Sequence, residues 1–141
     1  MKSAKMMFAF ALTMLPMLAS AQLSSSDKIV TKVPFEFVVG NKTIPAGQCV
    51  VRVGTADLKT VTIRNGEGNV NLLSTIAPVE TAKTATAPAL VFHRYGDRYF
   101  LWGMKIEGTK TMYRLPETKA EMELRAQNVP VSEEILLAYL Q

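Results

Sequence analysis

The sequence predicts a mainly β protein: a single antiparallel β-sandwich or barrel of about seven strands, with one or two short C-terminal helices. Three observations favour this fold class. Short segments rich in valine, isoleucine, threonine and aromatic residues alternate with polar residues. Turn sequences join most of these segments closely. Strong helix formers become frequent only after Pro116. Short strands connected by tight turns are typical of antiparallel sandwiches and barrels.

The first 21 residues have the three parts of a secretory signal peptide. Met1–Lys5 is basic, Met6–Leu18 is apolar, and Ala19–Ala21 supplies the small residues of a cleavage site. A helix of this apolar length rises only about 20 Å, less than the roughly 30 Å hydrocarbon core of a bilayer. We therefore expect cleavage before Gln22, no stable membrane anchor afterwards, and an exported protein in the periplasm or outside the cell.

Removal of the signal peptide would shorten the chain from 141 to 120 residues and lower its net charge from +4 to +2, because Lys2 and Lys5 leave. This nearly neutral chain has no concentrated basic patch, which argues against a nucleic-acid partner. Residues 22–27 form an expected flexible leader. Residues 28–141 are long enough to bury one core, so we expect a single β-rich domain with a helical tail from about residue 116.

The first strand is expected over Lys28–Val39, where one side is consistently apolar. Pro34 lacks a backbone donor, so it places this strand at a sheet edge or marks a bulge. Gly40–Gly47 is rich in turn residues and predicts a connection. A second strand follows over Gln48–Val53.

The next two strands are expected over Lys59–Arg64 and Val70–Ala77, on either side of a glycine-rich hairpin loop. Glu80–Pro88 has neither helical nor strand periodicity and is expected to be an exposed loop. Trp102–Ile106 and Thr111–Leu115 then predict a hairpin near the end of the β region.

The best-specified segment is Leu90–Trp102, a predicted hairpin that holds five of the eleven aromatic residues and the single histidine. Its turn, Gly96-Asp97, suits a two-residue type II′ loop. This turn sets an expected register from Tyr95 opposite Arg98 to Val91 opposite Trp102. Both faces are half apolar, so each face should be at least partly covered, and Arg94 should lie against the ring of Tyr99.

Cross-strand packing is the preferred role for this hairpin. The alternative is a surface for an anionic or aromatic partner. Its candidate residues are His93, Arg94, Tyr95, Asp97, Arg98, Tyr99 and Trp102.

After Pro116 the pattern changes to helix. Glu117–Gln127 predicts a helix with Pro116 at its first position and Glu121 paired with Arg125. Ser132 is a candidate cap for a last short helix, with Ile135, Leu136, Tyr139 and Leu140 on one side; a final strand is the alternative.

Cys49 is the only cysteine in the chain. It shares a predicted strand face with Val51 and Val53, so we expect a buried thiol that behaves as a small hydrophobe. The alternative is dimerisation through Cys49.

No catalytic constellation is visible in the sequence. His93 is the sole histidine and no serine lies in a nucleophile-elbow context, while Glu36, Glu80 and Glu107 would meet as glycosidase carboxylates only through the fold. His93 and Asp97 are separated along the hairpin. One histidine and one thiol fall short of a zinc pattern. We therefore expect no catalytic, cofactor-binding or metal-binding residues and no cofactor.

Two stretches resemble a family. Val33–Gly40 with Ile44–Gly47, and Leu90–Leu101, are similar to the VPFxFxVG…PAG and LVFHRYGDxYFL motifs of a group of small exported proteins of Gram-negative soil bacteria. The resemblance spans about Lys28–Arg125, including the turn into helix at Leu115–Glu121. The family has no established activity or ligand, so the resemblance implies no functional residues. Cys49 stands where an aromatic residue is common, and Asn128–Gln141 extends past the usual end.

The sequence thus favours a non-catalytic envelope or extracellular interaction or structural module, whose partner is an envelope protein or a polymer. The alternative is a β-barrel that binds a small apolar ligand. Its cavity would be bounded by residues such as Phe35, Phe37, Phe92, Phe100 and Trp102. A hydrolase is a remote alternative.

Overall fold

The structure, a computed structural model, describes residues 28–54, 59–68 and 70–138. The signal peptide and leader expected before residue 28 lie outside these residues. The elements in chain order are β1 (Lys28–Val33), β2 (Phe37–Val39), β3 (Lys42–Ile44), β4 (Gly47–Val53), β5 (Thr60–Asn65), β6 (Asn71–Thr75), β7 (Ala77–Glu80), β8 (Ala89–Tyr95), β9 (Arg98–Lys105), β10 (Thr111–Arg114), α1 (Lys119–Ala126) and β11 (Ser132–Leu137).

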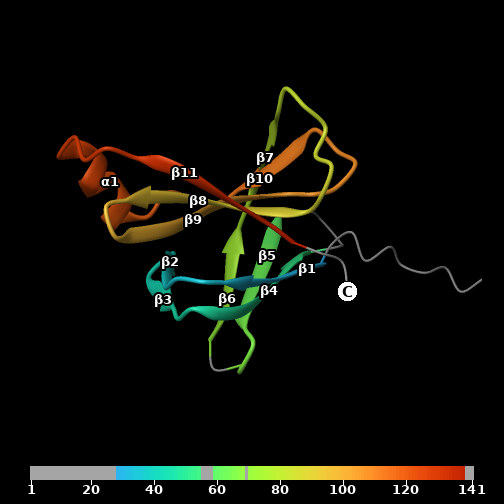
Figure 1. The fold of residues 1–141 in the computed structure, drawn as a ribbon, viewed down its shortest axis with the longest axis horizontal. Helices are drawn as coiled ribbons and strands as arrows, with labels where there is room; N and C mark the ends of the chain where they lie inside the picture. The colour runs from blue at the N-terminus through green and yellow to red at the C-terminus, as the bar shows by residue number, and fades with distance from the viewer. Residues whose placement is uncertain (1–27, 55–58, 69, 139–141) are drawn as a thin grey trace, which may run out of the picture.

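The described residues form two sheets, which confirms the mainly β prediction (Figure 1). Sheet A has the order β1-β4-β5-β6, with every pair antiparallel. Sheet B has the order β11-β8-β9-β10-β7, and β2 joins it by a parallel pairing to β9 while β3 pairs with β2. The sheets are not closed into a barrel, so the barrel alternative is wrong and the arrangement is sandwich-like.

The main core lies between the sheets. Sheet A contributes the buried alternate residues of β4 and β5, including Val51 and Ile63. Sheet B contributes Leu90, Phe92 and Leu101 from its central hairpin, which are all nearly or fully inaccessible to solvent. We call the side of sheet B that carries these residues its inner face and the opposite side its outer face.

The expected number of strands is wrong, because the described residues form eleven strands rather than about seven. The predicted first strand breaks into β1 in sheet A and β2 in sheet B, with Pro34 between them. The expected edge position is confirmed for β1, which is the outer strand of sheet A. Pro34, which has no N–H for a ladder, also marks the crossing between the two sheets.

Three further strands were not expected. The turn-rich segment before Gly47 holds β3, and the chain after β6 forms β7 at Ala77–Glu80. The predicted last helix is instead β11, an antiparallel neighbour of β8, so the alternative of a final strand is correct. Tyr139 and Leu140 lie outside the described residues.

The turn of the β8–β9 hairpin agrees with the prediction. Gly96 has φ of 60° and Asp97 does not have a positive φ, as a type II′ turn requires. The expected register holds from Tyr95–Arg98 as far as Phe92–Leu101.

Beyond these pairs the expected register is wrong. A bulge between Val91 and Phe92 shifts the ladder, so Val91 lies opposite Gly103 instead of Trp102. Gly103 suits this crowded position, since a Cβ there would lie 2.9 Å from the Tyr113 carbonyl oxygen.

Helix α1 confirms the predicted helix but begins later than expected. Its first residue is Lys119 rather than Pro116, and Thr118 caps it: the Thr118 hydroxyl oxygen accepts a hydrogen bond from the Glu121 N–H at 3.0 Å. At the other end Asn128 has φ of 58°, and the N–H groups of Asn128 and Val129 donate to the carbonyls of Arg125 and Leu124. This pattern is a Schellman motif.

Candidate functional site

The outer face of sheet B carries a row of polar and aromatic side chains. In spatial order the row contains Arg114 on β10, Trp102 on β9, His93 and Tyr95 on β8, and Glu121 on α1. We call these five residues the outer-face row. Figure 1 shows α1 at the end of the β8–β9 hairpin, which is where Glu121 meets the sheet.

Glu121 is the buried carboxylate of the outer-face row. Its Oε1 lies 2.7 Å from His93 Nδ1 and accepts a hydrogen bond of 2.9 Å from the Tyr95 hydroxyl. Burial, followed by the hydrogen bond to Glu121, raises the pKa of Tyr95 to about 12. Tyr95 therefore remains a neutral donor throughout the physiological range.

The link between His93 and Glu121 fixes the orientation of the imidazole. Nδ1 is the ring nitrogen that the carboxylate engages, at 2.7 Å from Glu121 Oε1. The ring also stacks on Trp102, with centroids 4.4 Å apart and planes inclined by 23°. His93 is thus held on two sides.

Trp102 is flanked by two nitrogen groups. Because β9 lies between β8 and β10, His93 and Arg114 approach the indole from opposite sides. The Arg114 guanidinium carbon lies 4.7 Å from the ring centroid, within the range of a cation–π contact. Arg114 Nε is inaccessible to water and has no hydrogen-bond acceptor among the described residues.

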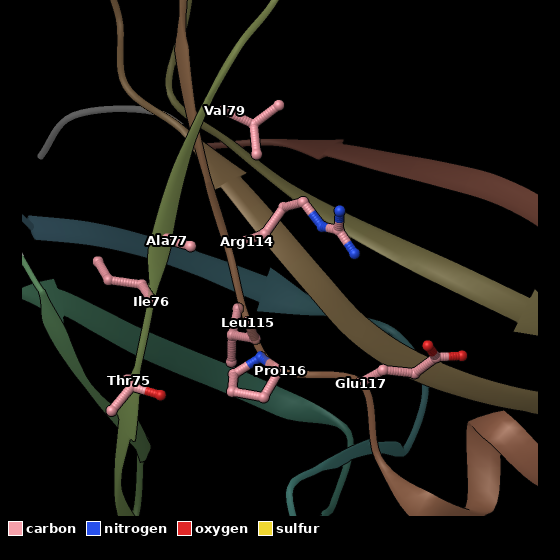
Figure 2. Close-up of a pocket in the computed structure, with 8 residues that line it drawn as sticks. All are labelled: Thr75, Ile76, Ala77, Val79, Arg114, Leu115, Pro116 and Glu117. Atoms are coloured by element: carbon pink, nitrogen blue, oxygen red, sulfur yellow. The ribbon is translucent and has the colours of Figure 1, made fainter.

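A pocket of about 270 Å³ adjoins the Arg114 end of the row. Its lining comes from the segment entering β7 and from the end of β10: Thr75, Ile76, Ala77, Val79, Arg114, Leu115, Pro116 and Glu117. Figure 2 shows Thr75 and Val79 at opposite ends of one chain segment, with Leu115 and Pro116 on the segment beside it.

The structure distributes the seven predicted surface residues over different parts of the hairpin. His93, Tyr95 and Trp102 come together in the outer-face row. Arg98 is also on the outer face and lies over the ring of Phe100, 5.2 Å from its centroid.

The other predicted surface residues lie elsewhere. Arg94 and Tyr99 are opposite one another on the inner-face side, and the expected contact is present, with Arg94 5.4 Å from the Tyr99 centroid. Tyr99 is also stacked on Phe35 at 3.7 Å, and Asp97 is exposed in the turn. The seven residues therefore do not share one face.

The sequence did not single out Arg114 as a candidate, and it gave Glu121 the wrong partner. The expected Glu121–Arg125 pair is absent: Arg125 Nη1 instead donates to both carboxylate oxygens of Glu117, at 2.6 and 2.7 Å. The spacing of Thr118 and Glu121 resembles a capping box, and this signal could have located the helix start but not the tertiary partners of Glu121.

Cys49 is buried in sheet A, away from the outer-face row. Burial raises the pKa of its thiol to about 12, so the reactive thiolate is strongly disfavoured. The expected buried thiol is confirmed. Among residues 28–138, apart from the gaps at 55–58 and 69, no group of three or more histidine, cysteine or acidic side chains is placed to hold a metal ion.

Among the described strands, β11 lies at one edge of sheet B. The Ala138 N–H donates to the Pro88 carbonyl at 2.8 Å, so it points toward β8. Backbone directions alternate along a strand, so the N–H and C=O groups of Glu133, Ile135 and Leu137 point away from β8. The side chains of Ile135 and Leu137 are 46% and 55% exposed.

Comparison with protein-family models, curated proteins and solved structures found no match to this chain. Within the described part of the chain, no helix has the length and apolar character needed to span a bilayer.

Proposed function

We propose that the protein is an exported, non-catalytic module that binds an extended segment of another envelope or extracellular protein along β11. The observation that carries this proposal is the outer edge of β11, which pairs with no other strand in the described part of the chain and where three residues direct their backbone groups away from the sheet. An exposed sheet edge is a template for an added strand, whose main-chain hydrogen bonds supply affinity.

The side chains of β11 define the kind of segment that fits. Glu133, Ile135 and Leu137 share the outer face, so a partner strand would place side chains directly opposite a carboxylate and two exposed aliphatic groups. The partner segment should therefore combine a lysine or arginine with aliphatic residues at alternate positions. Glu134 is already paired with Arg94 at 3.7 Å on the other face.

The aromatic residues of the core pack against one another. This packing favours an interaction module over a protein that binds a small apolar ligand in its core. Phe37 and Phe92 are essentially inaccessible to solvent and pack edge to face, with centroids 5.1 Å apart. Phe35 packs on Phe92 at 5.0 Å. These rings fill the core, as a protein of this size requires for its own stability.

A displayed library of ten-residue peptides tests the proposal. We expect selected peptides to show alternating aliphatic and basic residues and to protect the amide protons of Glu133, Ile135 and Leu137 from exchange. Ile135→Pro should weaken binding at least tenfold, because it removes an outward N–H without removing a hydrogen bond to β8.

Ile135→Val is the matched control, since it keeps the N–H, and should change binding less than twofold. Thermal unfolding of both variants checks that the sheet remains intact. Selected peptides whose binding is equally strong in Ile135→Pro, or whose contacts map away from β11, would refute the proposal.

A further inference from the structure

We propose that the pocket beside β7 binds a small monocarboxylate. Its carboxylate would meet the Arg114 guanidinium, and its apolar body would lie on Ala77 and Val79, which share the outer face with Arg114. This site is separate from the β11 edge and does not depend on the function proposed above.

The charge of Arg114 is uncompensated within the described residues. The ion pairs there join Arg94 with Glu134 and Arg125 with Glu117, and the buried Glu121 carboxylate contacts His93, so none of these contacts involves Arg114. Among the described residues, the electrostatic contact of the Arg114 guanidinium is the cation–π contact with the Trp102 ring. Nε is sealed from water and has no acceptor among the described residues. An anion at the Nη edge would supply the guanidinium with the charge partner that these residues do not provide.

The position of Arg114 suits a planar, two-oxygen ligand. The cation–π contact with Trp102 restrains the guanidinium, which reduces the conformational entropy lost when a ligand binds. A carboxylate can then accept two parallel hydrogen bonds from the guanidinium fork.

The other residues that line the pocket restrict the size, polarity and charge of the rest of the ligand. The pocket volume of about 270 Å³ is just below the roughly 300 Å³ lower end for drug-sized ligands. Most of its lining side chains are aliphatic, which favours an apolar body over inorganic phosphate. Glu117 at the same pocket would repel a second negative charge, even though Arg125 holds it, so a monoanion fits better than a dianion.

Intrinsic fluorescence provides a direct readout, since Trp102 is the only tryptophan in the chain and contacts Arg114. Octanoate should change the Trp102 emission saturably. Octanol, inorganic phosphate and the dianion suberate should each bind at least tenfold more weakly, because each lacks one required property.

Two variants locate the site. Arg114→Gln should abolish octanoate binding, whereas Arg98→Gln, which removes the other outer-face arginine stacked on a ring, should leave it within twofold. Ala77→Met keeps Arg114 but fills the pocket, so it should also weaken binding at least tenfold. In the unmodified protein, the Arg114 Nε–H resonance should shift on titration.

Five results would overturn the inference. Octanol could bind as tightly as octanoate, which would mean that the site recognises only apolar groups. Phosphate could bind as tightly as octanoate, which would mean that it recognises only an anion. Arg98→Gln could have the same effect as Arg114→Gln. Octanoate could bind unchanged to Ala77→Met. A peptide with a free aliphatic C-terminus could bind at least tenfold more tightly than octanoate, which would identify a peptide site.

Discussion

Glu121 joins the helix to the sheet through one carboxylate. Its Oε1 forms hydrogen bonds with both His93 and Tyr95, and these two residues lie on the same strand, β8. A buried carboxylate is tolerated in proteins when hydrogen bonds replace its water shell, and here two side chains do so. Helix α1 is therefore attached to the outer face of sheet B by a polar contact.

Replacing Glu121 should destabilise the protein. Glu121→Ala leaves the Tyr95 hydroxyl and His93 Nδ1 without their acceptor, at an expected cost of about 2–3 kcal/mol in the free energy of unfolding. Urea denaturation measures this cost. Glu123→Ala, on the exposed part of the same helix, is the control and should stay within about 0.5 kcal/mol of the unmodified protein. Equal effects of the two substitutions would show that the Glu121 contacts contribute nothing specific.

Tyr95 should make stability fall at alkaline pH. Its pKa rises from 10.0 to about 12 in the folded protein, so above pH 10 the unfolded chain loses this proton while the folded protein keeps it. Fewer bound protons in the unfolded state mean that the free energy of unfolding decreases as pH rises from 10 to 12.

Cys49 acts in the same direction from pH 9 to about 12, so the comparison is best made in a Cys49→Ala background. Denaturation at several pH values should show a shallower decline in Tyr95→Phe than in its Cys49→Ala parent. Identical slopes would contradict the assignment to Tyr95.

At the scale of elements, the features set by local chemistry were predicted from the sequence better than the features set by tertiary contacts. Gly96-Asp97 identified a hairpin and its turn type because a two-residue loop depends on the backbone of those residues alone. The bulge at Val91 and Phe92 depends on neighbours across the sheet, so the turn could not reveal it. The same limit applies to β11, because Ser132–Leu137 gains its strand partner only from β8.

The candidate-site residues also divide into those that local sequence identifies and those that only tertiary contacts identify. His93 and Trp102 were identifiable as members of an aromatic hairpin. Glu121 and Arg114 acquire their roles from contacts between α1, β10 and the hairpin, which no local pattern encodes. A resemblance without known functional residues could not supply those contacts.

The end of α1 allows a test of an element boundary. Asn128 adopts the left-handed conformation of the Schellman motif at φ of 58°, which is favoured by glycine. Asn128→Gly should stabilise the protein slightly, by up to about 1 kcal/mol, whereas Asn128→Ala should destabilise it by about 1 kcal/mol. Thermal unfolding of both variants measures the difference, and an opposite order would be inconsistent with this cap.

At the scale of the whole molecule, the chain passes repeatedly from one sheet to the other. It leaves sheet A after β1, returns at β4, and leaves again after β6 to enter β7. Both sheets contribute to one buried core. Neither sheet is therefore built from one continuous part of the described sequence.

This interleaving means that cooperativity should extend over the entire domain. Separating the two sheets would expose the buried aliphatic residues of both to water. A state in which only one sheet is folded should therefore be unstable. Differential scanning calorimetry should give one heat-absorption peak whose calorimetric and van't Hoff enthalpies agree. Two peaks would mean that the layers melt independently despite their shared interior.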